Sequence, residues 1–206
     1  WLDLEPFSPI FYERSRAATT WLAALIDPIS GHGPNLGSND GAYCYHLGTQ
    51  PYRDFRSTLQ LASVVFDHRP ALPSGPWDEP LYWLGLALDD SLVEDTQVFS
   101  TSIFRLFPFG GYAVFAPTTT SWALLRLPHY RFRPAHADPL HLDLWHQGVN
   151  LLRDGGSYSY NASSSDLTYF PGIASHNSVQ FDGAEPMPRL GRFLWGNWLQ
   201  LEAQPL

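Results

Sequence analysis

The feature of this sequence that most constrains its fold is a change of hydrophobic pattern near residue 95. Before that point, apolar residues recur at helical spacing, as Ala17, Trp21 and Leu25 do within YERSRAATTWLAALID. After it, apolar and polar residues alternate in short runs bounded by glycine and proline, which is typical of β-strands. We therefore predict an α+β protein, with an α-helical segment over 1–94 and an antiparallel β-sandwich over 95–206.

Three helices are expected in the first segment. The first covers 12–27 and ends before Pro28. The second covers 51–66, with Pro51 in its first turn, where proline is tolerated. The third lies within DEPLYWLGLAL, and the polar stretch SGHGPNLGSNDGAYCYHLG between the first two predicts a loop. The second helix is expected to bury one apolar face, formed by Phe55, Leu59, Ala62 and Phe66.

Six short strands are expected in the second segment. Turns are predicted at PFGG and at HQG, because glycine supplies the backbone conformations that tight turns need. In LHLDLWHQ the leucines fall on one face, and His141, Asp143 and Trp145 fall on the other. The six predicted strands are VFSTSIFRLF, GGYAVFAP, SWALLRLPH, LHLDLWHQ, VNLLRDGG and HNSVQFDG.

Charge and composition narrow the classes of function. The net charge is −8 and no basic run is present, which argues against nucleic-acid binding. The basic residues are arginines, whose planar guanidinium groups suit the recognition of carboxylates. Aromatic residues make up 15% of the chain, enough for a core and for stacking against sugar rings. The single Cys44 excludes an internal disulfide and a thiolate zinc site.

No apolar run is long enough to predict a membrane span, and no signal peptide is recognisable. The sequence opens at Trp1 without methionine or a basic leader, so we expect a piece of a longer protein. The apolar face of the first helix would then lack part of its packing, which favours self-association.

Three polar side chains are expected to meet at one edge of the sheet. His136 stands before the strand LHLDLWHQ, and the next strand, across the HQG turn, ends on Asp154. In an antiparallel hairpin the start of one strand lies beside the end of the next, so these two side chains are expected at the same edge. His176 opens the last predicted strand. Two histidines and one aspartate match a zinc site with an open fourth position; the alternative is that the histidines form ordinary hydrogen bonds in loops.

Several motifs together resemble one known family. RPAHADPLHLDLW, VNLLRDGGSYSYN and YFPGIASHNSVQFDG occur in this order, preceded by DPISGHGPNLGSNDGA. From about Ala17 to Trp198 the chain resembles the heparinase II/III-like family of bacterial polysaccharide lyases. The resemblance implies an α/α toroid joined to an antiparallel β-sandwich, and cleavage of acidic polysaccharides by β-elimination. It also implies a metal, usually zinc, on His136, Asp154 and His176.

The chemistry that the resemblance implies needs further residues. Elimination at a uronic acid requires a group that neutralises the C5 carboxylate, a base for the C5 proton and an acid for the departing O4. Tyr169 is our candidate catalytic phenol, with ordinary packing as the alternative. Arg133 and Tyr160 are candidates for substrate binding, as are Asn39 and Asp40, for which capping of the next helix is the alternative.

Three features of the motifs qualify this prediction. Many relatives carry His-x-His-Ala-Asp, and here Pro134 stands in place of the first histidine and cannot transfer a proton. Asp138 either orients His136 or forms a turn. The toroid residues that relatives use in catalysis are expected before Trp1, so we predict that these 206 residues alone lack lyase turnover.

We therefore predict a polysaccharide lyase that acts on a uronate-containing acidic polysaccharide and is periplasmic or secreted. One alternative is a non-catalytic carbohydrate-binding or scaffold relative, in which the metal is structural. Another is a zinc hydrolase with an activated water, although no clear glutamate base stands beside the predicted ligands in the sequence.

Overall fold

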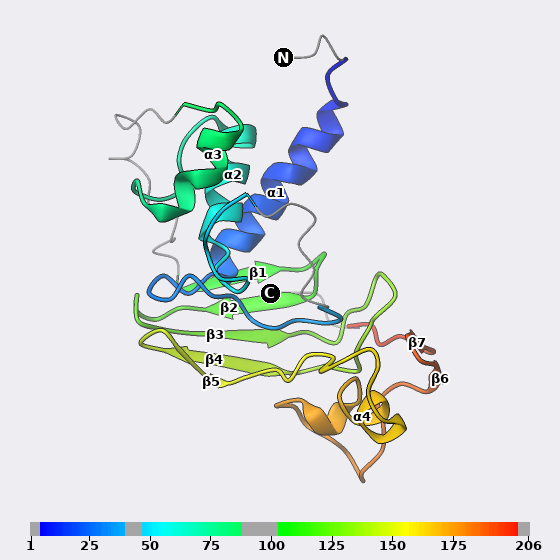
Figure 1. The fold of residues 1–206 in the computed structure, drawn as a ribbon. Helices are drawn as coiled ribbons and strands as arrows, with labels where there is room; N and C mark the ends of the chain where they lie inside the picture. The colour runs from blue at the N-terminus through cyan, green and yellow to red at the C-terminus, as the bar shows by residue number, and fades with distance from the viewer. Residues whose placement is uncertain (1–4, 40–46, 88–102, 202–206) are drawn as a thin grey trace. The chain divides into compact units, whose positions relative to one another are not determined.

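The structure is a computed structural model that describes residues 5–39, 47–87 and 103–201. The chain divides into two compact units. Within the described residues, the helical unit holds the chain up to Ile26, 31–33 and 47–87, and the second unit holds 27–30, 34–39 and 103–201. Helices followed by antiparallel strands confirm the α+β class (Figure 1). The predicted boundary between residues 94 and 95 lies outside the described residues.

The helical unit packs short helices around a small apolar core. None of the described helices is long and apolar enough to cross a bilayer. The core is formed by the buried residues Ala23, Ile26, Leu59, Ala71 and Leu72. The helical elements are α1 (Pro9–Leu25), α2 (Arg56–Asp67), the 3₁₀ turn η1 (Pro76–Asp78) and α3 (Glu79–Trp83).

The predicted helices are present, but two details of the prediction are wrong. In α1 the predicted residue Leu25 is buried, but Ala17 is exposed, and the other buried positions are Thr19 and Ala23, which lie outside the predicted stripe. α2 begins at Arg56 rather than in the first turn after Pro51. The reason for the later start is a turn, closed by a hydrogen bond of 2.9 Å from the Asp54 N–H to the Pro51 carbonyl.

One buried polar residue joins α2 to the segments that follow it. The Gln60 side chain donates to the Leu72 carbonyl at 3.1 Å and to Asp78 Oδ1 at 2.8 Å. Its Oε1 accepts the N–H groups of Ala71 and Leu72 at 2.8 and 2.9 Å. Gln60 is fully buried, so these bonds satisfy an amide that has no access to water.

The second unit is built on an antiparallel sheet with the strand order β1-β2-β3-β4-β5. In Figure 1 these strands lie side by side, with α4, β6 and β7 beyond one end of them. Only the later part of the predicted strand VFSTSIFRLF lies among the described residues. The elements are β1 (Phe104–Phe107), β2 (Tyr112–Phe115), β3 (Ser121–Arg126), β4 (Leu142–His146), β5 (Val149–Leu152), α4 (Ser164–Tyr169), the 3₁₀ turn η3 (Ile173–Ser175), β6 (Arg189–Gly191) and β7 (Leu194–Trp195).

The hairpin of β4 and β5 sets the position of Asp154. Its turn uses Gln147 and Gly148, with φ angles of 49° and 80°, as expected for a two-residue turn at the predicted HQG. His146 pairs with Val149, so β5 runs back along β4. Asp154 therefore returns toward the start of β4, as the hairpin argument predicts.

The buried face of β4 is the one that carries polar residues. Asp143 and Trp145 are buried, whereas Leu142 faces outward. Trp145 stacks on Trp122 of β3 with ring centroids 5.4 Å apart, and Trp122 Nε1 donates to Asp27 Oδ2 at 3.1 Å. Tryptophan is amphipathic, so this face can be buried while its N–H groups bind buried carboxylates.

The predicted strand HNSVQFDG is wrong. The segment that begins at His176 is a loop, because Val179 and Phe181 are both exposed and have no sheet face to bury them. Asn177 docks it on the start of β4 instead. The Leu142 N–H donates to the Asn177 carbonyl at 2.9 Å, which fixes the residue next to His176.

Candidate metal centre

Contacts of Arg126 with two tyrosine rings and with Asp138 hold the segment that carries His136. The guanidinium carbon of Arg126 lies 4.5 Å from the ring centre of Tyr112 and 4.6 Å from that of Tyr130. Tyr130 donates its hydroxyl to Asp138 Oδ1 at 2.7 Å, and Arg126 Nε lies 3.8 Å from the same oxygen. Burial and then the Asp138 carboxylate raise the pKa of Tyr130 above its ordinary value, so the phenol stays a proton donor. Asp138 thus anchors this segment by side-chain contacts that do not include His136.

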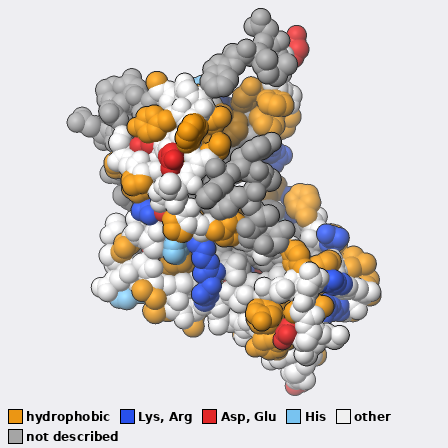
Figure 2. Space-filling model, in the orientation of Figure 1, with side chains coloured by type: hydrophobic (Ala, Val, Ile, Leu, Met, Phe, Trp, Pro, Cys, Tyr) orange, Lys and Arg blue, Asp and Glu red, His pale blue; other side chains and the backbone are white. Residues whose placement is uncertain are grey.

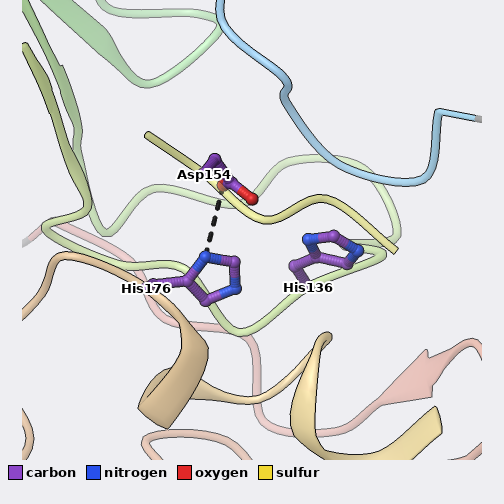
Figure 3. Close-up of side chains that lie close together, drawn as sticks. All are labelled: His136, Asp154 and His176. Carbon is purple, nitrogen blue, oxygen red and sulfur yellow. Dashed lines mark ion pairs between the residues drawn. The ribbon is translucent and has the colours of Figure 1, made fainter. Parts of the chain in front are cut away.

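His136, Asp154 and His176 meet in the second unit (Figure 3). One ligand atom from each lies within 4.8 Å of the others, and His176 Nδ1 is 3.2 Å from Asp154 Oδ2. Their exposed fractions are only 2%, 0% and 8%. His136 comes from the loop before β4, Asp154 lies two residues after β5, and His176 follows η3. The structure therefore brings together the three residues predicted as metal ligands.

Neighbouring groups hold two of these side chains by their other polar atoms. His136 Nε2 lies 2.9 Å from Ser157 Oγ, and Asp154 Oδ1 accepts the Gly156 N–H at 2.7 Å. Such outer contacts are the usual means of orienting metal ligands. Gly156 has a φ of 64°, and a Cβ there would lie 2.3 Å from the Asn35 side-chain nitrogen, so glycine is needed at this turn.

The remaining polar atoms of His136, Asp154 and His176, called the triad below, fit a cation. His136 Nδ1, Asp154 Oδ2 and both ring nitrogens of His176 are buried without a hydrogen-bond partner. Buried polar atoms are rarely left unpaired, because each lost hydrogen bond costs about 1–3 kcal/mol. Two imidazole nitrogens and one carboxylate oxygen are ligands that zinc and related divalent ions accept. Ligand atoms at about 2.1 Å from a tetrahedral ion lie about 3.4 Å apart, and the 3.2 Å between His176 Nδ1 and Asp154 Oδ2 is close to this separation.

Burial also favours the protonation states that bind metals. Burial lowers the pKa of His136 below its ordinary value, and the Asp154 carboxylate opposes this only in part. Burial alone would raise the pKa of Asp154, but the nearby His176 and the Gly156 N–H outweigh it and hold that pKa below its ordinary value. A neutral imidazole and an ionised carboxylate are the forms that coordinate a cation.

A third buried histidine borders the triad. His141 Nδ1 accepts the Asn177 N–H at 3.1 Å. Its Nε2 lies 3.7 Å from Asp143 Oδ2 and 3.8 Å from Asp154 Oδ2, and its ring centre is 5.5 Å from that of His176. His141 therefore lies directly behind the predicted ligands.

The predicted substrate residues lie at different places around this centre. Arg133 and Tyr160 line one cavity of about 340 Å³. Asn39 is exposed and follows Ser38, whose carbonyl accepts the Tyr160 hydroxyl at 3.1 Å. Tyr169 is the last residue of α4 and is 52% exposed. It belongs to the same unit as the residues that line the cavity, but it is not one of them. The predicted residue Asp40 lies outside the described residues.

Comparison with known proteins identifies the family. A family model described as Heparinase II/III-like, C-terminal, matches residues 100–205, just over half of the chain. The chain belongs to the heparinase II/III-like family. None of the curated proteins compared with it matches.

Solved structures share the fold of this heparinase II/III-like chain. "Crystal Structure of Heparinase III" is 16% identical with a TM-score of 0.57, covering 86% of this chain and 27% of that chain. The "Heparinase III-BT4657 gene product" is 16% identical with a TM-score of 0.52, covering 84% of this chain and 25% of that chain. At such identity the likeness shows the fold alone. This chain spans about a quarter of the length of those proteins.

Sequence reasoning missed four residues of this heparinase II/III-like site. Ser157 holds His136, His141 borders Asp154, and Arg192 and Phe193 line the cavity beside Arg133. His141 could have been found, because it shares a strand face with Asp143 in HLDLW. The turn between β6 and β7 offers no comparable signal, because the other residues that line this cavity are more than thirty residues away in the sequence.

Proposed function

We propose that this chain forms part of a polysaccharide lyase that cleaves a uronate-containing acidic polysaccharide by β-elimination. The observation that carries the proposal is the buried meeting of two imidazoles and one carboxylate in a chain of the heparinase II/III-like family. We also propose a periplasmic or extracellular location, where such polymers are encountered. The 206 residues alone are expected to lack turnover, since they span about a quarter of the heparinase III structures.

We propose that the ion is zinc, held by His136, Asp154 and His176. The two nitrogen ligands support zinc over magnesium or calcium, which prefer oxygen ligands. A bound divalent ion supplies a fixed positive charge among the loops that carry its ligands. Ser157 keeps the His136 ring oriented, because its Oγ lies 2.9 Å from Nε2 and leaves Nδ1 to face the centre.

Other side chains are proposed to contact the sugar. Arg133 is exposed and is proposed to neutralise the substrate carboxylate, which makes the neighbouring C5 proton more acidic. Tyr160 and Asn39 are proposed to border the bound polymer, together with Asp40. Tyr169 is proposed to transfer a proton through its exposed phenol.

A second candidate function is a carbohydrate-binding relative in which the ion only joins loops. The observation that favours it is burial, because His136, Asp154 and His176 are exposed by 8% or less and leave substrate little access to an ion. Pro134 also stands where many relatives have a histidine, and proline cannot transfer a proton.

Elimination creates a C4–C5 double bond that absorbs ultraviolet light, which gives a direct test. The full-length protein is incubated with heparan sulfate, hyaluronan and alginate, and absorbance is followed. We expect a rise with one of these polymers, at least tenfold slower in His176→Ala and unchanged in His146→Ala, whose imidazole is exposed on β4. No rise with any polymer would instead favour the carbohydrate-binding function.

A further inference from the structure

The second unit, which carries the five-stranded sheet and is called the sheet-bearing unit below, contains a cavity lined by arginine and aromatic side chains. Its volume is about 340 Å³, at the small end of the range for ligand sites and suited to a short stretch of sugar. No aspartate or glutamate contributes to the described lining. The lining residues are Ser38, Arg133, Ala135, Tyr160, Asn161, Arg192 and Phe193.

Within the described part of the chain, the two arginines of this cavity have no acidic partner. Arg56 and Arg126 lie beside Asp54 and Asp138, whereas Arg133 and Arg192 form no ion pair among the residues that the structure describes. Both unpaired residues are exposed. In a chain with a net charge of −8, two unpaired guanidinium groups at one cavity form a local site for anions.

Aromatic rings lie beside these positive charges. The rings of Tyr160 and Phe193 meet edge to face with centroids 5.5 Å apart, and the Arg192 guanidinium lies 5.1 Å from the Phe193 ring centre. Figure 2 shows arginine and hydrophobic side chains side by side on the surface near β6 and β7. Apolar rings next to charged donors suit a sugar that carries an anionic group.

The cavity continues toward the metal centre. A narrower pocket shares Arg192, Tyr160 and Phe193 with it, and adds His136 and Ser157 to the lining. The cavity therefore adjoins the pocket lined by Ser157, the side chain that lies 2.9 Å from the first predicted metal ligand.

We infer that this cavity is a subsite for an anionic sugar, with Arg133 and Arg192 binding its carboxylate or sulfate and the two rings supporting the sugar. The inference rests on the proposed function and deepens it, because it assigns recognition of the substrate's charge to these residues. Arg192 and Phe193 come from the turn between β6 and β7, so that turn determines specificity.

Direct binding separates this inference from lyase activity. Calorimetry measures binding of an unsulfated glucuronate–N-acetylglucosamine tetrasaccharide to the full-length protein, in comparison with the same tetrasaccharide after reduction of its carboxyl groups to alcohols. A third ligand, carboxyl-reduced but 6-O-sulfated, distinguishes sulfate from carboxylate recognition. We expect at least one anionic ligand to bind tenfold more tightly than the neutral one.

Two single variants and a matched control locate the binding site. Arg133→Gln and Arg192→Gln are each expected to weaken binding of the anionic ligand by about tenfold or more, the effect of losing a charge-assisted hydrogen bond. Arg131→Gln removes the same charge outside the cavity, where Arg131 stacks on Phe109, and should leave affinity within about twofold. Circular dichroism confirms that each variant is folded.

Three results would overturn the inference: no binding of any ligand, equal binding of the neutral ligand, or equal losses in Arg131→Gln and the cavity variants. Equal binding of the neutral and anionic ligands by the parent protein, with its lyase activity present, would contradict this site alone. Selective binding without elimination would contradict the proposed lyase alone.

Discussion

At His141 a backbone contact decides which ring nitrogen carries the proton. The Asn177 N–H can only donate, so Nδ1 must accept, and the neutral ring carries its hydrogen on Nε2. That N–H faces the carboxylates of Asp143 and Asp154 at 3.7 and 3.8 Å. His141 is therefore placed to position Asp154, whereas the proposed ion would be bound by other side chains.

The substitution His141→Leu tests this positioning role. We expect zinc affinity to fall about 10- to 100-fold, because the donor behind Asp154 is lost. His141→Gln can keep an N–H near the same place and should recover part of the affinity. Competition with a chromophoric chelator measures the dissociation constants.

His146→Leu is the matched control, since His146 is exposed on β4 and bonds to Ser121. Circular dichroism of the metal-free variants separates misfolding from weakened binding. Zinc binding as tight in His141→Leu as in the parent would show that His141 does not position the ligand.

The sequence predicted the triad better than it predicted its surroundings. The proximity of His136 and Asp154 could be predicted by counting residues back from the hairpin turn, because pairing of the two strands places the start of β4 beside the end of β5. His176 was chosen because it opens a predicted strand, but its segment is a loop, so strand geometry does not explain its position. Ser157 was missed because a loop serine has no periodic pattern that marks its partner.

At the scale of single elements, the buried faces of a strand and a helix carry polar residues, although the hydrophobic pattern predicts apolar residues there. The buried face of β4 carries Asp143, and the buried face of α2 carries Gln60. Periodicity locates such elements, but it cannot reveal a polar side chain whose hydrogen-bond partners lie in distant loops. For this reason the elements were predicted more accurately than their buried faces.

Gln60→Ala tests the contribution of that buried amide. The N–H groups of Ala71 and Leu72 would lose their acceptor, so we expect the free energy of unfolding to fall by about 3 kcal/mol. Urea unfolding followed by far-ultraviolet circular dichroism measures the change. Val65→Ala, at an exposed position of the same helix, should change it by about 0.5 kcal/mol. Equal effects of the two substitutions would contradict the assigned role of Gln60.

On the scale of the whole molecule, metal binding concerns one unit. The three predicted ligands and their neighbours His141 and Ser157 all belong to the sheet-bearing unit, whereas Gln60 lies in the helical core. An ion that binds only the folded state stabilises the unit that holds its ligands.

Zinc is therefore expected to protect the two units unequally. At a free concentration a hundred times its dissociation constant, it should stabilise the sheet-bearing unit by about 2.7 kcal/mol. Hydrogen exchange of peptides from β4 and from α2 measures both units in one sample. We expect slower exchange in β4, little change in α2 and no zinc response in His136→Ala. Equal slowing in both peptides, or zinc retained by His136→Ala in elemental analysis, would contradict this expectation.

The loop after α1 makes the sheet-bearing unit discontinuous along the chain. Asp27 accepts the Trp122 N–H across 95 positions, and the Asn35 amide lies 3.5 Å from the Asp154 carbonyl. A polypeptide started at β1 would leave the buried Trp122 indole without its acceptor and the Asp154 carbonyl without its contact to Asn35. Swapping sheets between homologues therefore requires transplanting 27–39 along with the strands.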